Sequence, residues 1–585
     1  MTQKVADFIL ERLLDWGVTR IYGYPGDGIG GLTAAIGRAD APEFIQTRHE
    51  EEAAFMACAH AKWTGKIGVC MATSGPGAIH LLNGLYDAKL DHQPVMALIG
   101  QQARSALGGH YQQEVDLNAL YKDVASDFLG TCLVPEQARH LIDRAMRIAK
   151  ARRNVTAVIL PSDVQDLKAA EPPQAHGTVH SSLAYAAPQV LPNAAELEKA
   201  AEVLNAGHKV AILVGAGALG AEHEVTAVTE KLGAGVAKAL LGKAVLPDDL
   251  PFVTGSIGLL GTEPSDWMMR HCDTFLMIGS RFPYSEFLPE EGQARGVQID
   301  LDPTMLSIRY PMEVALTGDA RVTLKALLPL LEEKKRASWR SRIERHVAKW
   351  RDGAEERAMV EASPVNPERV FWEAAARLPD NAVVAADSGT AANWYARALT
   401  FRPGMKGTLS GTLATMCPAV PYATAAKFAF PDRVAVGFVG DGAMQMLGNA
   451  ALITIAKYWR SWSDPRLVIC VLNNGDLNQV TWELRGMSES PRVPETQDVP
   501  AFDYAAYARS LGLEGIRVER SEEIAPAWER AFTTDRPVLI DALTDPDVPT
   551  LPPHVSIKQA QSYATAILKG DPDTRGILWH TFKRS

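Results

Sequence analysis

Short apolar segments alternate with helical patterns along almost the whole chain, and this alternation restricts the fold more than any other feature. Val210–Val214 and Val434–Val439 are typical, because each apolar run is followed by a turn and then by a segment with helical periodicity. Strands that alternate with helices form parallel sheets, and such strands are buried on both faces. The sequence therefore predicts an α/β protein built from doubly wound parallel sheets.

The alternation falls into three blocks, which indicates three domains in a chain of 585 residues. A stretch rich in Pro, Ala, Ser and His separates the first two blocks, and a charged helical pattern separates the last two. The predicted segments are a first domain at 1–170, a linker at 171–192, a central domain at 193–335, a connecting helix at 336–365, a third domain at 366–550 and a tail at 551–585.

The composition of the chain restricts its expected partners and cellular compartment. A net charge of −10 argues against nucleic acid as a partner. The start of the chain lacks a signal peptide pattern, and no apolar run approaches the roughly 20 residues of a membrane helix. The six cysteines are scattered without CxxC spacing, as expected for buried thiols in a reducing compartment. We therefore expect a cytoplasmic protein, with peripheral attachment to the inner membrane face left open.

The third block contains a candidate metal site. The apolar run Val434–Val439 leads directly into Gly440-Asp441-Gly442, and a later strand ends at Asn473-Asn474. Glycines let the backbone turn tightly beside a phosphate, and the following helix offers free N–H groups. Asp441 and Asn474 supply oxygen ligands of the kind that Mg²⁺ prefers. A strand-turn-helix with a surface aspartate is the structural alternative.

Together these motifs resemble the signature of thiamine-diphosphate enzymes, although the thirty residues between Gly442 and Asn473 include an apparent insertion. The resemblance implies that Asp441, Asn474 and the backbone carbonyl of Asp476 bind Mg²⁺. The residues that it assigns to the diphosphate are Gly389, Thr390, Gly440, Gly442, Ala443 and Met444.

Glu50 begins a small-residue helical pattern after Arg48-His49. Acidic residues favour the first turn of a helix, so a simple helix start is one interpretation. The other is that Glu50 resembles the glutamate that this family presents to the N1′ atom of the aminopyrimidine, where it favours the imino form of the cofactor. That role is general acid-base catalysis through the cofactor.

Other motifs match the family's pyrimidine-binding domain in order. The positions implied to contact the cofactor there are Pro25, Gly26, Thr73 and Asn83. Met416 matches the bulky residue that bends the cofactor, with a core methionine as the alternative. In this family the pyrimidine and diphosphate domains of one site come from different subunits. The resemblance thus implies a homodimer or homotetramer with active sites at the subunit interface.

The central block raises the question of a flavin. A glycine loop after Val210–Val214 is by itself a weak nucleotide signal. Later motifs resemble flavin-binding thiamine enzymes, although the fold persists in relatives without the nucleotide. The positions implied to bind FAD are Gly215, Gly217, Gly258, Leu259, Gly279, Ser280, Arg281, Phe282, Asp300 and Asp319.

The order of all these motifs is most similar to bacterial pyruvate oxidase, with acetolactate synthase next. The resemblance implies thiamine-diphosphate- and flavin-dependent oxidative decarboxylation of pyruvate or a related 2-oxo acid, with a quinone as electron acceptor. A carboligase or lyase of the acetolactate synthase type, without net redox chemistry, is the alternative within this class. A non-catalytic assembly protein is the alternative from another class, and the presence of Glu50, Asp441 and Asn474 argues against it.

The resemblance weakens around the substrate. Gln113 matches a family glutamine near the thiazolium, but Gln112 stands where an aromatic residue is expected. Gln479 also replaces an aromatic residue, Trp482 takes the place of a slimmer one, and Glu483 follows as a further catalytic candidate. Two polar replacements predict a pocket that prefers a more polar 2-oxo acid than pyruvate. The end of the tail, 571–585, lacks a clean amphipathic helix, so lipid activation is not expected.

Overall fold

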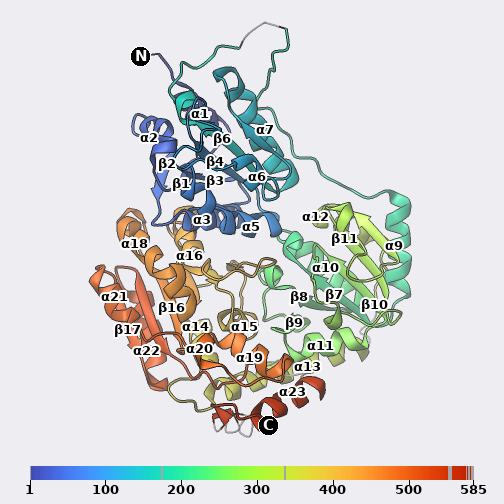
Figure 1. Cartoon of the computed structure of the whole chain (residues 1–585). Helices are drawn as coiled ribbons and strands as arrows, with labels where there is room; N and C mark the ends of the chain where they lie inside the picture. The colour runs from blue at the N-terminus through green and yellow to red at the C-terminus, as the bar shows by residue number, and fades with distance from the viewer. Residues whose placement is uncertain are drawn as a thin grey trace.

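The computed structural model describes residues 2–172, 176–334, 338–550, 557–574, 576–577 and 580. These residues form three six-stranded sheets in which all neighbouring strands are parallel. The first sheet shows that both faces are buried: Cys70 and Ala72 face one apolar cluster, whereas Val69 and Met71 face another. The predicted α/β class with doubly wound parallel sheets is confirmed (Figure 1).

The first sheet lies in the N-terminal part of the chain. Its strands are β1 (Arg20–Gly23), β2 (Glu43–Gln46), β3 (Gly68–Ala72), β4 (Val95–Gln101), β5 (Leu129–Thr131) and β6 (Val155–Pro161). Its helices are α1 (Val5–Asp15), α2 (Gly30–Ile36), α3 (Glu50–Thr64), α4 (Pro76–His80), α5 (Leu82–Leu90), α6 (Leu117–Tyr121), α7 (Ala138–Arg152) and α8 (Ser162–Gln165).

The second sheet lies in the middle of the chain, after a linker whose described residues form neither helix nor strand. Its strands are β7 (Val210–Val214), β8 (Gly235–Lys238), β9 (Val253–Ser256), β10 (Thr274–Ile278), β11 (Arg295–Asp300) and β12 (Val314–Thr317). Its helices are α9 (Ala194–Ala206), α10 (Glu222–Leu232), α11 (Glu263–His271) and α12 (Ala320–Leu327), and α13 (Ser338–Met359) connects it to the third sheet.

The third sheet follows α13. Its strands are β13 (Val383–Ala386), β14 (Lys406–Thr408), β15 (Ala435–Gly440), β16 (Leu467–Asn473), β17 (Glu514–Val518) and β18 (Val538–Leu543). Its helices are α14 (Pro367–Arg377), α15 (Thr390–Arg397), α16 (Ala419–Ala429), α17 (Asp441–Ala443), α18 (Asn449–Tyr458), α19 (Asn478–Met487), α20 (Pro494–Gln497), α21 (Tyr504–Ser510), α22 (Ile524–Thr533) and α23 (Ile557–Leu568).

Each sheet has a point at which the strand order reverses direction. The orders are β2-β1-β3-β4-β6-β5, β12-β11-β10-β7-β8-β9 and β14-β13-β15-β16-β18-β17. The reversals therefore lie between β1 and β3, between β7 and β10, and between β13 and β15. In open parallel sheets, ligands bind beyond the carboxyl ends of the strands at such points. The fold thus provides three candidate binding positions, one per sheet.

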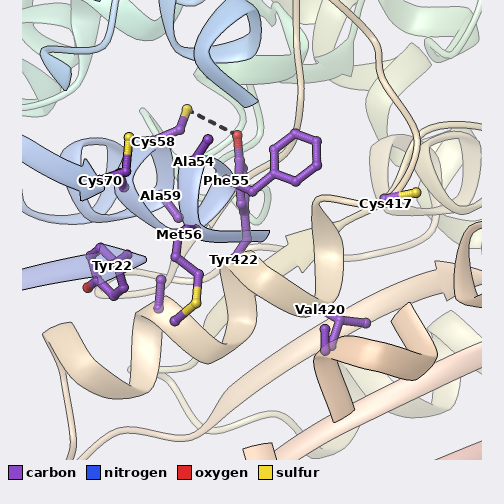
Figure 2. Packing of buried hydrophobic residues seen from close by; sticks show 14 of the residues in the cluster. Tyr22, Ala54, Phe55, Met56, Cys58, Ala59, Cys70, Cys417, Val420 and Tyr422 are labelled. Carbon is purple, nitrogen blue, oxygen red and sulfur yellow. Dashed lines mark hydrogen bonds between the residues drawn. The ribbon is translucent and has the colours of Figure 1, made fainter. Parts of the chain in front are cut away.

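The first and third sheets share one apolar core. Helix α3 packs against α16, so residues such as Phe55 and Met56 belong to the same buried cluster as Val420 and Tyr422. Figure 2 shows this junction, where Cys58 of α3 faces Tyr422 of α16 across 3.3 Å. The N-terminal and C-terminal domains of one chain are therefore packed tightly together.

One detail differs from the sequence prediction, and one prediction lies partly outside the described residues. After Gly440-Asp441-Gly442, where the sequence predicts a helix, the structure has a π-helical turn at Met444–Gly448 before α18. Single π turns inside helices are frequent at functional sites. The tail prediction lies partly outside the described residues, which include α23. None of the helices in the described ranges is long and apolar enough to cross a membrane.

Candidate active site

Asp441 lies at the reversal point of the third sheet, directly after β15. Its side chain is 2% exposed and accepts hydrogen bonds from the backbone N–H groups of Gly442, Asn474 and Gly475 at 2.8, 2.9 and 2.6 Å. Burial raises the pKa of the Asp441 carboxyl to about 6, and only the backbone donors oppose this. A buried carboxylate held by neutral donors is a site where a cation would be stabilised.

Asn474 and Asp476 lie next to Asp441, beyond the end of β16. The Asn474 amide oxygen accepts a hydrogen bond from the Asp476 N–H at 3.0 Å. The Asp476 carboxylate is occupied by Asn478, Thr481 and Arg492, each at 3.0 Å. The Asp476 side chain is therefore committed to the protein, and its backbone carbonyl remains as the ligand that the sequence predicted. The donor set fits Mg²⁺, which takes carboxylate, amide and carbonyl oxygens.

The glycines of this site leave room for a diphosphate. A Cβ atom on Gly440 would meet no other atom within 4 Å, and Gly389 has a φ of 88° with only Gln479 within that distance. Gly389 follows β13 and Thr390 opens α15, so this helix start faces the same reversal point as Asp441. Ala443 and Met444 are buried in the turn after Asp441. The arrangement fits a diphosphate bound by helix N-termini and Mg²⁺.

Met416 lies against this turn. Its methyl group is 3.4 Å from the position that a Cβ atom on Gly442 would take. Ala414 and Cys417 on either side of it have positive φ angles of 52° and 85°, which non-glycine residues rarely adopt. Asp387 accepts hydrogen bonds from the N–H groups of Cys417 and Ala419, and burial raises its pKa to about 7. The structure therefore places Met416 beside the predicted diphosphate site.

Glu50 begins α3 and is 8% exposed. Its Oε2 atom lies 3.0 Å from Nδ1 of His80, and the rings of His49 and His80 stack with centroids 4.4 Å apart. A Cβ atom on Gly77 would lie 3.2 Å from Glu50 Oε1, so only glycine leaves this oxygen clear. His80 is not among the residues that the sequence predicts, although it follows the Thr73–Gly77 motif by three residues. The structure adds His80 as a partner that orients Glu50.

The other predicted pyrimidine contacts lie at the reversal point of the first sheet. Pro25 and Gly26 follow β1, and a Cβ atom on Gly26 would be 2.5 Å from Thr73 Cβ. Asn83 points elsewhere. Its amide donates to Glu51 at 2.6 Å and to the Thr415 hydroxyl at 3.0 Å, so it is tied to the Met416 segment of its own chain.

The predicted substrate-side glutamines have different environments. Gln113 has a φ of 61° and its Oε1 accepts from Ser74 at 3.0 Å, whereas Gln112 is exposed. Gln479 is already paired inside the protein: it accepts from Asn393 at 2.8 Å and donates to Glu483 at 3.0 Å. Gln479 therefore does not need a polar substrate group, which removes part of the basis for predicting a polar substrate.

Trp482 is 2% exposed and faces the C-terminal segments. Its indole N–H donates to the Pro546 carbonyl at 3.2 Å, and its ring stacks on Tyr563 of α23 with centroids 5.9 Å apart. Trp482 thus anchors α19 to α23 and has no open face of the kind expected for a pocket-lining residue.

At the reversal point of the central sheet, the turns after β7 and β10 are pressed together. A Cβ atom on Gly215 would lie 2.4 Å from the Gly279 carbonyl oxygen, and one on Gly217 would lie 2.7 Å from Gly279 Cα. Ser280 is buried beside them. A Cβ atom on Gly258, which has a φ of 94°, would meet the Phe282 ring at 2.7 Å, and Leu259 is half-buried next to it.

Two arginines near these turns have guanidinium groups that are partly buried. Burial lowers the pKa of Arg281, which Asp300 and Asp302 oppose, and its ion pair with Asp302 spans 3.8 Å. The Nε atom of Arg309 is buried and has no hydrogen-bond partner in the described part of the chain. Such groups fit an anionic nucleotide. Asp319 differs from the prediction in its local role, because its side chain caps α12 by accepting from Val322 N–H at 3.1 Å.

Within one chain, Asn83 links the two halves of the predicted thiamine site through Thr415, but the proposed acid-base and metal residues are not bonded to each other. Among the described residues, no hydrogen bond or ion pair joins Glu50 or His80 to Asp441, Asn474 or Asp476. Exposed apolar side chains flank both halves: Ile79 is 46% exposed beside His80, and Met446 is 66% exposed in the turn after Asp441.

Known proteins agree with this geometry. Three family models match the chain: the N-terminal, central and C-terminal domains of thiamine pyrophosphate enzymes, at residues 3–120, 197–327 and 387–542. YdaP of Bacillus subtilis strain 168, which is provisionally described as a thiamine pyrophosphate-containing protein, is 34% identical to this chain. The match covers 100% of this chain and 99% of YdaP.

Two further relatives have named activities. Pyruvate oxidase of Lactiplantibacillus plantarum is 29% identical over 96% of this chain and 91% of its own length. The large subunit of acetolactate synthase isozyme 2 of Escherichia coli K12 is 30% identical over 92% of this chain and 95% of its own length. The arrangement of Asp441, Asn474 and Glu50 on this fold, and these matches over the full length, show that the chain belongs to the thiamine pyrophosphate enzyme family.

Proposed function

We propose that this enzyme is a thiamine-diphosphate- and flavin-dependent oxidoreductase that decarboxylates pyruvate or a related 2-oxo acid. The observation that carries the proposal is the nucleotide-type site of the central sheet. There, two glycine turns meet at the strand reversal point near two arginines: Arg281, whose ion pair with Asp302 spans 3.8 Å, and Arg309, whose buried Nε atom has no hydrogen-bond partner among the described residues. The similarity to pyruvate oxidase over 96% of the chain supports it.

Asp441, Asn474 and the Asp476 carbonyl would hold Mg²⁺, and Gly389 and Gly440 would admit the diphosphate. When bound, thiamine diphosphate supplies a nucleophilic carbon that attacks the substrate carbonyl group. Glu50 would hold a proton at the N1′ atom of the aminopyrimidine, and His80 would orient the Glu50 carboxyl at 3.0 Å. Met416 would support the cofactor from beside Gly442.

The central domain would hold FAD, which accepts two electrons and passes them to a quinone. Gly215, Gly217 and Gly279 would let the nucleotide approach the backbone at the ends of β7 and β10. Arg281 and Arg309 would face its phosphates. Asp300, whose pKa is raised by burial, lies beside Arg281 and would face the ribose.

The enzyme would act as a homodimer or as a homotetramer. Among the described residues, no hydrogen bond or ion pair joins Glu50 to Asp441 within one chain, and the exposed Ile79 and Met446 near them offer apolar surfaces for a second copy. A partner subunit that contributes Glu50 to the Asp441 site would complete the constellation and cover both side chains. The six unpaired, buried thiols fit a reducing cytoplasm.

The second candidate is a carboligase of the acetolactate synthase type. The E. coli acetolactate synthase subunit matches this chain at an identity similar to that of pyruvate oxidase. Spectroscopy of the purified protein separates the two functions. A yellow protein whose flavin band bleaches with a 2-oxo acid under anaerobic conditions, and recovers with a soluble quinone, supports the oxidoreductase. A colourless protein, or a yellow one that turns over without bleaching, supports the carboligase and overturns the proposal.

A further inference from the structure

A lysine is buried at the junction of the N-terminal and C-terminal domains of one chain. Lys62, in the last turn of α3, has a side chain that is 4% exposed. Its ammonium donates to Asp91 at 2.7 Å, to the Leu409 carbonyl at 2.7 Å and to the Tyr422 hydroxyl at 2.8 Å. All three donors are thus used. Burial alone would lower the pKa of Lys62, but Asp87 and Asp91 raise it, so the group is charged.

Asp91, which pairs with Lys62, also accepts hydrogen bonds from the backbone of the third domain. Its Oδ2 and Oδ1 atoms accept from the N–H groups of Gly411 and Thr412 at 2.9 and 2.7 Å. Its side chain is fully buried, and the Lys62 charge holds its pKa below the usual range despite that burial. Lys62 and Asp91 together therefore bind three backbone groups of the segment 409–412.

The same segment continues into Met416 through strained backbone. Ala414 and Cys417 have φ angles of 52° and 85°. Such conformations persist only where surrounding contacts impose them. The second half of the segment is held by Asn83, Ser388 and Asp387, which contact Thr415 and Cys417. The first half is held from the other domain by Lys62 and Asp91, which leaves the Met416 side chain between two fixed ends.

We propose that Lys62 and Asp91 are positioning residues that hold the segment 409–417 so that Met416 stands against the Gly442 turn and shapes the bound cofactor. The proposal rests on the cofactor site described under Proposed function. The Lys62–Asp91 ion pair then does more than join two domains, because the backbone groups that it binds belong to the segment that contains Met416. A shift of about 1 Å in a positioning element can reduce the rate about 100-fold.

Lys62→Met tests the proposal in the full chain with Mg²⁺, because it keeps the length of the side chain and removes its charge and donors. We expect thiamine diphosphate, titrated by intrinsic tryptophan fluorescence, to bind about 10- to 100-fold more weakly. Met416→Ala should weaken binding similarly, and the double variant should be no worse than the weaker single variant. Additive losses would show that Lys62 does not act through Met416.

Lys238→Met is a matched control. Lys238 is also fully buried, pairs with Asp248 at 2.5 Å and so supports an aspartate that accepts from the backbone N–H of Phe401 at 2.8 Å. It thus joins the central and C-terminal domains without touching the 409–417 segment. We expect it to lower the Tm as Lys62→Met does while cofactor affinity stays within about threefold. If Lys62→Met and Lys238→Met lost the same cofactor affinity, Lys62 would contribute to the stability of the fold and would not position Met416.

Asp91→Asn decides the question if Lys62→Met does not fold. The amide is isosteric and keeps one oxygen for Gly411 or Thr412, and a folded Asp91→Asn chain with wild-type cofactor affinity would overturn the proposal. Wild-type protein that fails to bind thiamine diphosphate would instead overturn the proposed cofactor site. Wild type that binds, with a Lys62→Met variant that binds equally well, would overturn the positioning role alone.

Discussion

Three consecutive glutamates at the start of α3 have three different environments. Glu50 contacts His80, Glu51 accepts from Asn83, and Glu52 is fully buried with its Oε2 bound to the Arg48 N–H at 2.8 Å. Successive residues of a helix point about 100° apart, so the three carboxyl groups at the start of α3 lie in different surroundings. At the level of single residues, the chemistry depends on which direction each carboxyl takes.

Glu50→Gln tests the residue in the proposed proton transfer. The amide keeps the size of the side chain and can still contact His80, but it cannot supply a proton to the aminopyrimidine. We expect cofactor affinity to remain and kcat at saturating cofactor to fall about 10²- to 10⁴-fold. A variant that keeps more than half of the wild-type rate would remove Glu50 from this role.

Asp441→Ala tests the proposed metal ligand. The change deletes the one carboxylate in the predicted Mg²⁺ set, whose other members are neutral oxygens. We expect thiamine diphosphate to bind at least about 10- to 100-fold more weakly in excess Mg²⁺. Titration of the cofactor by fluorescence measures this. Unchanged affinity would exclude Asp441, and with it the neighbouring Asn474, from the metal site.

Glu52→Gln tests the buried carboxyl. Burial raises the pKa of Glu52 to about 7, so the folded chain binds this proton more tightly than the unfolded chain does. The folded state therefore loses stability as pH rises from about 4.5 to about 7, by up to about 3 kcal/mol. We expect Glu52→Gln to gain stability relative to wild type between pH 5 and pH 8, measured by urea unfolding. Glu136→Gln, at an exposed position, is the control, and a stability difference independent of pH would contradict the assignment.

At the scale of elements, the strands could be predicted well and the contacts between elements could not. Val210–Val214 is a strand with the predicted bounds, because a continuous apolar run is a local signal. The π turn at Met444–Gly448 and the partners of Asn83 depend on tertiary contacts that the sequence pattern does not encode. His80 was missed for the same reason: nothing in its local sequence shows that α4 turns it toward Glu50.

In helix α19, tertiary contacts that the sequence does not encode change the expected substrate specificity. Gln479 was predicted to need a polar substrate group, but Asn393 and Glu483 already pair with its amide. We therefore expect Gln479→Phe to lower kcat/KM for pyruvate and for a polar 2-oxo acid alike, about 10-fold, since it leaves Asn393 unpaired and frees Glu483. Gln112→Phe, at an exposed position, should shift preference toward pyruvate. A selective gain for pyruvate in Gln479→Phe would restore the original interpretation.

At the scale of the whole molecule, the three reversal points account for the position of each predicted site. Asp387 and Asp441 follow β13 and β15, Gly26 and Thr73 follow β1 and β3, and Gly215 follows β7. The sequence motifs could be assigned to strand ends because each follows an apolar run. The pairing of Glu50 with Asp441 across two subunits is implied by the family resemblance alone, because the pattern of apolar runs within one chain does not encode how copies of the chain associate.

Mixing two inactive variants tests whether one site is built from two subunits. If the Glu50 of one subunit serves the Asp441 site of the other, a dimer of one Glu50→Gln chain and one Asp441→Ala chain has one intact site and one doubly altered site. Random pairing after co-expression places half of the chains in such mixed dimers. We expect about one quarter of wild-type activity, whereas each variant alone is nearly inactive. If both residues acted within one chain, every site in the mixture would lack one of them, and the mixture would be as inactive as its parts. Activity per total protein in the mixture, and in the mixed dimer isolated by two affinity tags, where about half of wild-type activity is expected, distinguishes the two arrangements.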